Sequence, residues 1–134
     1  MKTREDIEGF LNRIAAEGAT YSEPEPGLWV VKPGGELDFD VVVHCSADVV
    51  LLRVKVMDPP QDEGEQLALF RRLLEFNSED LVHGSYGLDA GVVVLTDTLS
   101  LSHLDYEEFQ ASYESITLAL ASHLRELGSH REAR

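Results

Sequence analysis

Cysteine is almost absent from this chain of 134 residues, since Cys45 is the only one. A single cysteine cannot form an intramolecular disulfide, so we expect a fold held by its hydrophobic core in a reducing cytoplasm. Long apolar runs are also missing, because the longest, Val49–Leu52, is far too short to span a membrane. No apolar segment follows the charged N-terminus, and a secretory signal peptide is therefore not expected.

Basic residues are scarce as well, with 11 Lys and Arg against 25 Asp and Glu and a formal net charge of −14. A chain this acidic repels phosphate backbones and anionic lipid surfaces, so we expect neither nucleic-acid binding nor membrane binding. High solubility accounts for such a charge, and a basic protein partner is the alternative. The length suits one domain, spanning residues 1–134.

Hydrophobic periodicity predicts an α+β domain. Apolar residues spaced by three and four predict helices over 3–17, 65–77 and 105–128, with N-caps at Thr3 and Asp105. Alternation and β-branched residues predict strands, which we place over 28–32, 37–44, 49–57, 83–88 and 92–101. The order is α-β-β-β-α-β-β-α, and short turns between strands favour an antiparallel sheet with the helices packed on it.

Three segments need separate comment. Residues 21–27 contain two prolines and are interpreted as a broken, edge-like stretch, because proline cannot donate to a strand ladder. Gly128 is expected to end the last helix, and residues 128–134 are expected to fray. The apolar stripe of that helix is long enough that its far end could reach a partner chain. The second helix has its predicted apolar stripe at Leu67, Phe70, Leu73 and Leu74.

No catalytic, metal or cofactor site is expected. The segment from His83 to Gly87 carries Gly-Ser-Tyr-Gly, which lacks the spacing and the strand-to-helix turn of a nucleophile elbow, so its glycines are interpreted as packing positions. His44 and Cys45 are neighbours on a strand and point to opposite faces, so they cannot share a metal ion. His123 is seven residues from His130, but Gly128 interrupts the helix between them.

Two single residues have alternative interpretations. Cys45 is adjacent to no Lys or Arg and is interpreted as a small buried apolar residue rather than a reactive thiol. Trp29, the sole tryptophan, is either a core residue or an anchor on a binding groove, since tryptophan is enriched at interface hot spots.

A family resemblance lies in the segments Leu73-Leu74-Glu75-Phe76-Asn77, Gly84-Ser85-Tyr86-Gly87-Leu88 and Val92-Val93-Val94-Leu95. With the order of elements, they resemble the type III secretion chaperone-like fold, which includes the CesT-like secretion chaperones and the YbjN proteins. The motif concerns packing and turns, and so it speaks for the fold more than for the function.

The resemblance implies a non-catalytic homodimer that binds a segment of a partner protein. It places dimer contacts on the second helix and the following strand, at Leu69, Phe70, Leu73, Tyr86 and Leu88. It places partner contacts on the first helix and first strands, at Phe10, Leu11, Trp29 and Val31. One alternative is a YbjN-like regulatory or stress-related protein that holds no client, and another is an enzyme with an unrecognised site.

Overall fold

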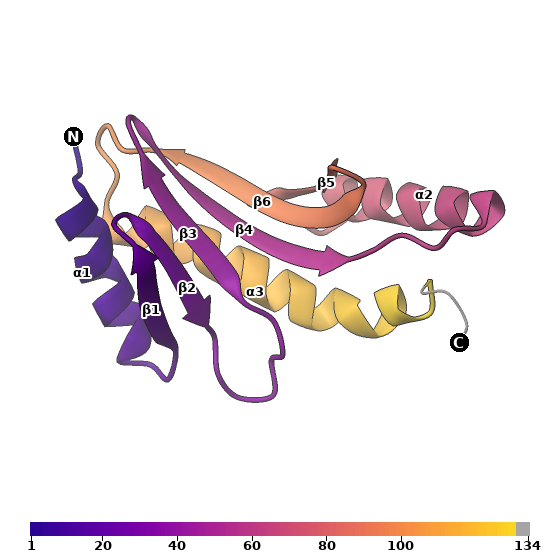
Figure 1. The fold of residues 1–134 in the computed structure, drawn as a ribbon, viewed down its shortest axis with the longest axis horizontal. Coiled ribbons are helices and arrows are strands. Elements are labelled where there is room, and N and C mark those ends of the chain that lie inside the picture. Colours follow the sequence, from indigo (N-terminus) through magenta and orange to yellow (C-terminus); the bar gives the residue numbers. More distant parts are fainter. Residues whose placement is uncertain (131–134) are drawn as a thin grey trace.

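The computed structural model describes residues 1–130 and contains nine helices and strands (Figure 1). They are α1 (Arg4–Ala15), β1 (Thr20–Glu25), β2 (Leu28–Lys32), β3 (Val41–Ser46), β4 (Val49–Met57), α2 (Glu63–Glu79), β5 (Ser85–Asp89), β6 (Val92–Ser100) and α3 (Tyr106–Gly128). The predicted α+β class is confirmed, with one strand more than expected. In the described part of the chain no helix is long and apolar enough to cross a membrane.

The additional strand is β1, which includes most of the stretch interpreted as broken. It pairs with β2 along one side, and the register shifts between Ser22 and Glu25, around Pro24. An edge strand needs no donor on its free side, and a bulge leaves one residue unpaired, so Pro24 is tolerated there. The edge position agrees with the prediction, whereas the paired strand around Pro24 was not expected.

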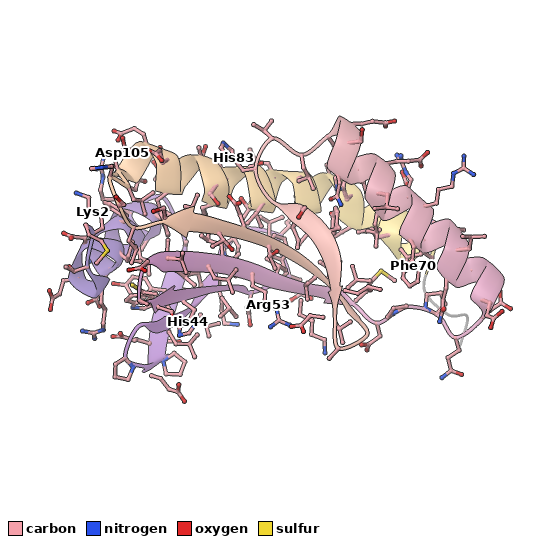
Figure 2. All side chains as sticks on the ribbon, turned by 90° about the horizontal axis from the view of Figure 1, so that it is seen from above. Lys2, His44, Arg53, Phe70, His83 and Asp105 are labelled. Atoms are coloured by element: carbon pink, nitrogen blue, oxygen red, sulfur yellow. The ribbon has the colours of Figure 1, made fainter. Side chains whose placement is uncertain are left out.

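The six strands form one sheet in the order β1-β2-β3-β4-β6-β5, and every neighbouring pair is antiparallel. The helices pack on one face of this sheet, with α3 lying along most of its length (Figure 1). His44 and Arg53 lie on the side away from α3 (Figure 2). An antiparallel sheet can leave one face to solvent in this way, with alternating residues pointing to the core.

Side-chain caps account for where the helices begin. Thr3 and Asp6 form a reciprocal capping box at α1, and the Asp105 carboxylate accepts from the Glu108 amide at 2.8 Å at α3, both as predicted. Helix α2 begins two residues earlier than expected, because Asp62 caps it through the Glu65 amide at 2.9 Å. It also continues past Asn77, the expected stop.

Four further expectations need correction or qualification. Strand β3 begins at Val41 rather than residue 37, and β5 begins at Ser85, because Gly84 has a φ of +83° that breaks the strand. At the far end of the α3 stripe, Leu127 is buried in the chain's own core, whereas Leu124 is half-buried and keeps some accessible surface. Gly128 is the last helical residue, but the predicted fraying of 128–134 falls largely on residues 131–134, which lie outside the described residues.

The core lies between the sheet and the three helices, and two of its aromatic residues, Trp29 and Tyr113, have a buried polar atom with no hydrogen-bond partner among residues 1–130. Tyr113 on α3 is buried, and its hydroxyl has no hydrogen-bond partner among residues 1–130. Burial raises the pKa of Tyr113 to about 12, which keeps the hydroxyl protonated. An unpaired buried hydroxyl opposes folding, because it gives up its bonds to water without replacement.

We expect Tyr113→Phe to leave the free energy of unfolding unchanged or to raise it by about 1 kcal/mol, since only an unpaired hydroxyl is removed. Urea denaturation measures the change. The matched control is Tyr86→Phe, which removes a buried hydroxyl that is bonded to His123 at 2.8 Å and should lower the stability. Equal losses in the two variants would contradict the assignment of Tyr113 as unpaired.

Candidate protein-binding surfaces

Helix α2 carries two apolar stripes. Leu69, Leu73 and Phe76 are buried against the sheet and α3. The second set, here called the α2 outer stripe, consists of Leu67, Phe70 and Leu74, spaced by three and four residues. Leu67 is 70% exposed and Leu74 is 68% exposed. Of the four residues predicted to form one stripe, only Leu73 therefore belongs to the core.

The α2 outer stripe lines a shallow groove on the surface of α2, and its other lining residues, Arg71, Glu75, Ser78 and Glu79, belong to the same helix. More exposed apolar residues lie nearby. Val82 follows α2, Leu88 is 53% exposed on β5, and Leu118 of α3 lines a groove with Glu79 and Asp80 at the end of α2. Exposed apolar side chains gathered in one region are the usual mark of an interaction surface.

The residues predicted for the dimer interface divide between this surface and the core. Phe70 is half-buried beside the groove, and Leu88 is exposed. Leu69, Leu73 and Tyr86 are at most 6% exposed and support the surface from beneath. A role for these residues in a dimer interface stays a prediction. The sequence could not tell which side chains of α2 face outward, because the buried and the exposed sets are both apolar.

The residues predicted to contact a partner lie on α1 and β2. Leu11, Trp29 and Val31 are at most 1% exposed. Phe10 is half-buried, with its ring 5.8 Å from that of Tyr106 and 5.6 Å from that of Phe109. Of the four, only Phe10 has surface to offer in this conformation, and a contact role for the set stays a prediction.

An ion pair joins α1 to the β1–β2 hairpin at the edge of this region. The Arg4 guanidinium donates to the Glu23 carboxylate at 2.9 and 3.0 Å, and the Gly27 amide donates to the same carboxylate at 2.9 Å. These bonds stabilise the ionised form and lower the pKa of Glu23. The hairpin is thus fastened to α1 while the outer side of β1, an edge strand, remains unpaired in the described chain.

Asn77 explains why the Leu73–Asn77 and Gly84–Leu88 segments occur together. Its side-chain nitrogen donates to the Tyr86 carbonyl at 3.1 Å, and its side-chain oxygen accepts from the Tyr86 amide at 2.7 Å. The amide side chain thus bonds β5 as a neighbouring strand would. Gly84 is required nearby, because a Cβ there would lie 2.9 Å from the carbonyl oxygen of Thr96. The motif fastens α2 to β5.

A hydrogen-bonded chain of three side chains ties this unit to α3. The Tyr86 hydroxyl lies 2.8 Å from Nδ1 of His123, and Nε2 of His123 lies 2.9 Å from the Asp80 carboxylate. The His123 ring stacks on Phe76 at 3.6 Å between centroids. A neutral ring satisfies every group, with the hydroxyl donating to Nδ1 and Nε2–H donating to Asp80. Burial raises the pKa of Tyr86, so its hydroxyl remains a donor.

The hydrogen-bonded residues Asp80, His123 and Tyr86 have the order carboxylate, imidazole, hydroxyl that hydrolases use, but the hydroxyl is not accessible. Tyr86 is 6% exposed. Ser115, in the adjoining groove, is bonded through its hydroxyl to the backbone of His83 at 3.1 and 3.3 Å. This cluster therefore offers no exposed nucleophile and serves to hold three elements together. Sequence reasoning missed it, because the three residues lie far apart along the chain.

The strand cysteine and its neighbour are placed as expected. His44 is exposed on the open face of the sheet, whereas Cys45 is half-buried and packs against the core on the other face. Burial raises the pKa of the Cys45 thiol, which lowers its reactivity. The predicted placement of the two neighbouring side chains on opposite faces of the strand is thus confirmed.

Several known structures have a similar fold. One is the ExoU–SpcU complex of the Pseudomonas aeruginosa type III secretion system, with a TM-score of 0.65, 18% identity, 87% of this chain covered and 94% of that one. A second is YbjN of E. coli, with a TM-score of 0.68 and 17% identity, where the match covers 93% of this chain and 93% of that one. A third is the HopA1–SchA chaperone–effector complex, with a TM-score of 0.55 and 13% identity, where the match covers 95% of this chain and 98% of that one.

At these identities the likeness to solved structures establishes the fold alone. No curated protein matches the chain in sequence. A family model does match, and it spans residues 1–132, which includes every element described above and both segments of the α2–β5 motif. The chain belongs to the CesT_Tir_1 family.

Proposed function

We propose that this protein is a non-catalytic binding module of the chaperone type, which acts as a homodimer and holds a segment of a partner protein. The observation that carries the proposal is the α2 outer stripe, Leu67, Phe70 and Leu74, an apolar helix face left uncovered by a chain that has a complete core of its own. The family supports the same function, and two of the similar folds come from complexes between two proteins.

The dimer contact we propose is the α2 outer stripe together with Leu88 of β5. A symmetric dimer needs one self-complementary patch, and an apolar helix face satisfies this requirement without pairing charges. Apolar contact also suits a chain with a net charge of −14, since two copies repel one another at longer range. The hydrogen bonds of Asn77 with Tyr86, and those of His123 with Tyr86 and Asp80, would keep this surface rigid.

The first test is Leu67→Glu combined with Leu74→Glu. Light scattering at micromolar concentration should give twice 14.9 kDa for the native chain and 14.9 kDa for the variant, because two buried carboxylates per copy would oppose contact. Both side chains are exposed, so the thermal stability of the separated chain should change little. The control is Val49→Glu, an exposed apolar residue on β4. A monomeric native protein would refute the dimer.

The partner segment, in our proposal, contacts the region of α1 and the first strands. Phe10 offers apolar surface there, and the free side of β1 can accept an added strand. Leu11, Trp29 and Val31 then act from beneath by holding α1 and β2 in place. Affinity capture from the native host, with mass spectrometry of the recovered proteins, tests for such a partner.

The YbjN fold supports a second candidate, a regulatory interaction protein that holds no client. The two candidates differ in the state of the partner. Recovery of one dominant folded partner, together with no suppression of aggregation of an unfolded client, would favour regulation. A partner that precipitates when this chain is removed would favour the chaperone function.

A further inference from the structure

Strand β4 lies inside the sheet, but its last residues have no neighbouring strand on the side of β3. Its ladder with β3 ends at the pair Val42 and Arg53, whereas its ladder with β6 continues to the pair Met57 and Val93. Val54, Lys55 and Met57 are therefore paired with β6 only, Val56 lies in a register shift and is paired on neither side, and β4 extends beyond the start of β3 (Figure 1). The chain before β3 approaches this edge as an irregular segment, with no strand structure over residues 33–40.

A groove of about 430 Å³ lies beside this free edge. Its apolar lining comes from the segment before β3, from β4 and from α3, namely Phe39, Val56, Leu120 and Leu124. Phe39, Val56 and Leu124 are only partly buried, so each contributes accessible apolar surface. An edge of unpaired backbone next to an apolar groove is the arrangement by which proteins accept an extended peptide strand.

Two basic residues flank the groove without partners. Lys55 and Arg125 are exposed and form no ion pair or hydrogen bond with another residue of the described chain, 1–130. By contrast, the basic side chains of Arg4, Lys32 and Arg53 are each paired with a carboxylate. Lys2, Arg13 and Arg71 also lack a carboxylate partner among residues 1–130, and Lys55 and Arg125 differ from them in lining one groove together.

A lysine at a strand edge also has a simpler function, because it discourages pairing between copies. That function accounts for Lys55 alone. It does not account for Arg125, which approaches from α3, or for the apolar groove between the two cations. Asp38 is the one acidic residue in the lining, and it leaves the groove with a net positive charge.

We propose that this groove binds an extended segment of a partner protein in which a carboxylate stands next to a large apolar side chain. The segment adds to β4 along residues 54–57, its apolar side chain enters the groove, and its carboxylate bonds Lys55 and Arg125. This site is separate from both the α2 outer stripe and β1. The inference rests on the proposed protein-binding function and assigns it a second site with a defined charge preference.

The test is selection of displayed random twelve-residue peptides against the native chain and against Lys55→Glu combined with Arg125→Glu. We expect the native chain to enrich peptides with Asp or Glu within two residues of a large apolar residue. We expect the variant to enrich Lys or Arg at that position and to bind the acidic peptides at least about tenfold more weakly, since two exposed attractions become repulsions. The selected peptides should shift the amide resonances of residues 54–57.

The control is Lys2→Glu combined with Arg13→Glu, which changes the net charge equally at sites that line neither this groove nor the α2 outer stripe and should retain the native preference. Identical peptides from the native chain and the groove variant would overturn this inference and leave the proposed function intact. Shifts confined to β1 or α2 would do the same. Enrichment of no peptide by any chain would overturn both.

Discussion

Replacing Trp29 by alanine should lower the free energy of unfolding by about 3–5 kcal/mol, the usual cost of removing a large aromatic side chain from a core. Trp29 is 0% exposed on β2, and a domain of this size has only about 5–15 kcal/mol of stability in total. Guanidinium or thermal denaturation measures the loss. A large part of the stability would thus depend on one side chain.

The control for this prediction is Trp29→Phe. It keeps an aromatic ring and removes the indole nitrogen, which is buried without a hydrogen-bond partner in the described chain. We expect it to cost much less than the alanine variant, because part of the lost packing is offset by the removal of an unpaired donor. If Trp29→Ala kept its full stability and lost only partner binding, Trp29 would be a surface anchor and its assignment to the core would be wrong.

Replacing His123 by alanine should cost about 3 kcal/mol, because three contributions are lost together. The ring leaves a cavity over Phe76, the Tyr86 hydroxyl loses its acceptor, and the bond from α3 to Asp80 disappears. Relative to the native chain, amide hydrogen exchange in the variant should accelerate more in β5 and the end of α2 than in β2 and β3. Separation of α2 from α3 would also weaken the proposed dimer.

A double-mutant cycle with Tyr86→Phe separates these contributions. The two substitutions should cost less together than the sum of their separate costs, by about 0.5–3 kcal/mol, since both break the same hydrogen bond. Additive losses would show that the 2.8 Å contact contributes nothing and that His123 acts by packing alone. If the His123→Ala protein were as stable as the native chain, the hydrogen bonds of His123 with Tyr86 and Asp80 would make no net contribution to the stability of the fold.

Local signals in the sequence were sufficient for the caps and for most of the elements. Thr3 and Asp105 were predictable as N-caps because capping depends on residues three positions apart. Asn77 was not predictable as more than a helix stop. Its side chain bonds the backbone of Tyr86, nine residues on, and that contact exists only once β5 lies against α2.

The surfaces were harder to predict than the fold, and α2 shows why. Leu67, Leu69, Phe70, Leu73 and Leu74 form one apolar arc that spans about 160° of the helix circumference, at 3.6 residues per turn. Periodicity can identify such a helix, but it cannot say which part of so wide an arc faces the sheet. Trp29 poses the same problem on a strand, where a core residue and a groove residue have the same alternation.

The sequence by itself determined the α+β class, the antiparallel order of most strands, the caps and the family resemblance, since these follow from periodicity and from contacts between near neighbours. Only the tertiary structure decided which apolar residues remain exposed, that His123 joins Tyr86 to Asp80, and that Lys55 and Arg125 meet at one groove. The physical reason is distance along the chain. Burial, hydrogen bonds between elements and the convergence of charges depend on how the helices pack on the sheet, which no local pattern records.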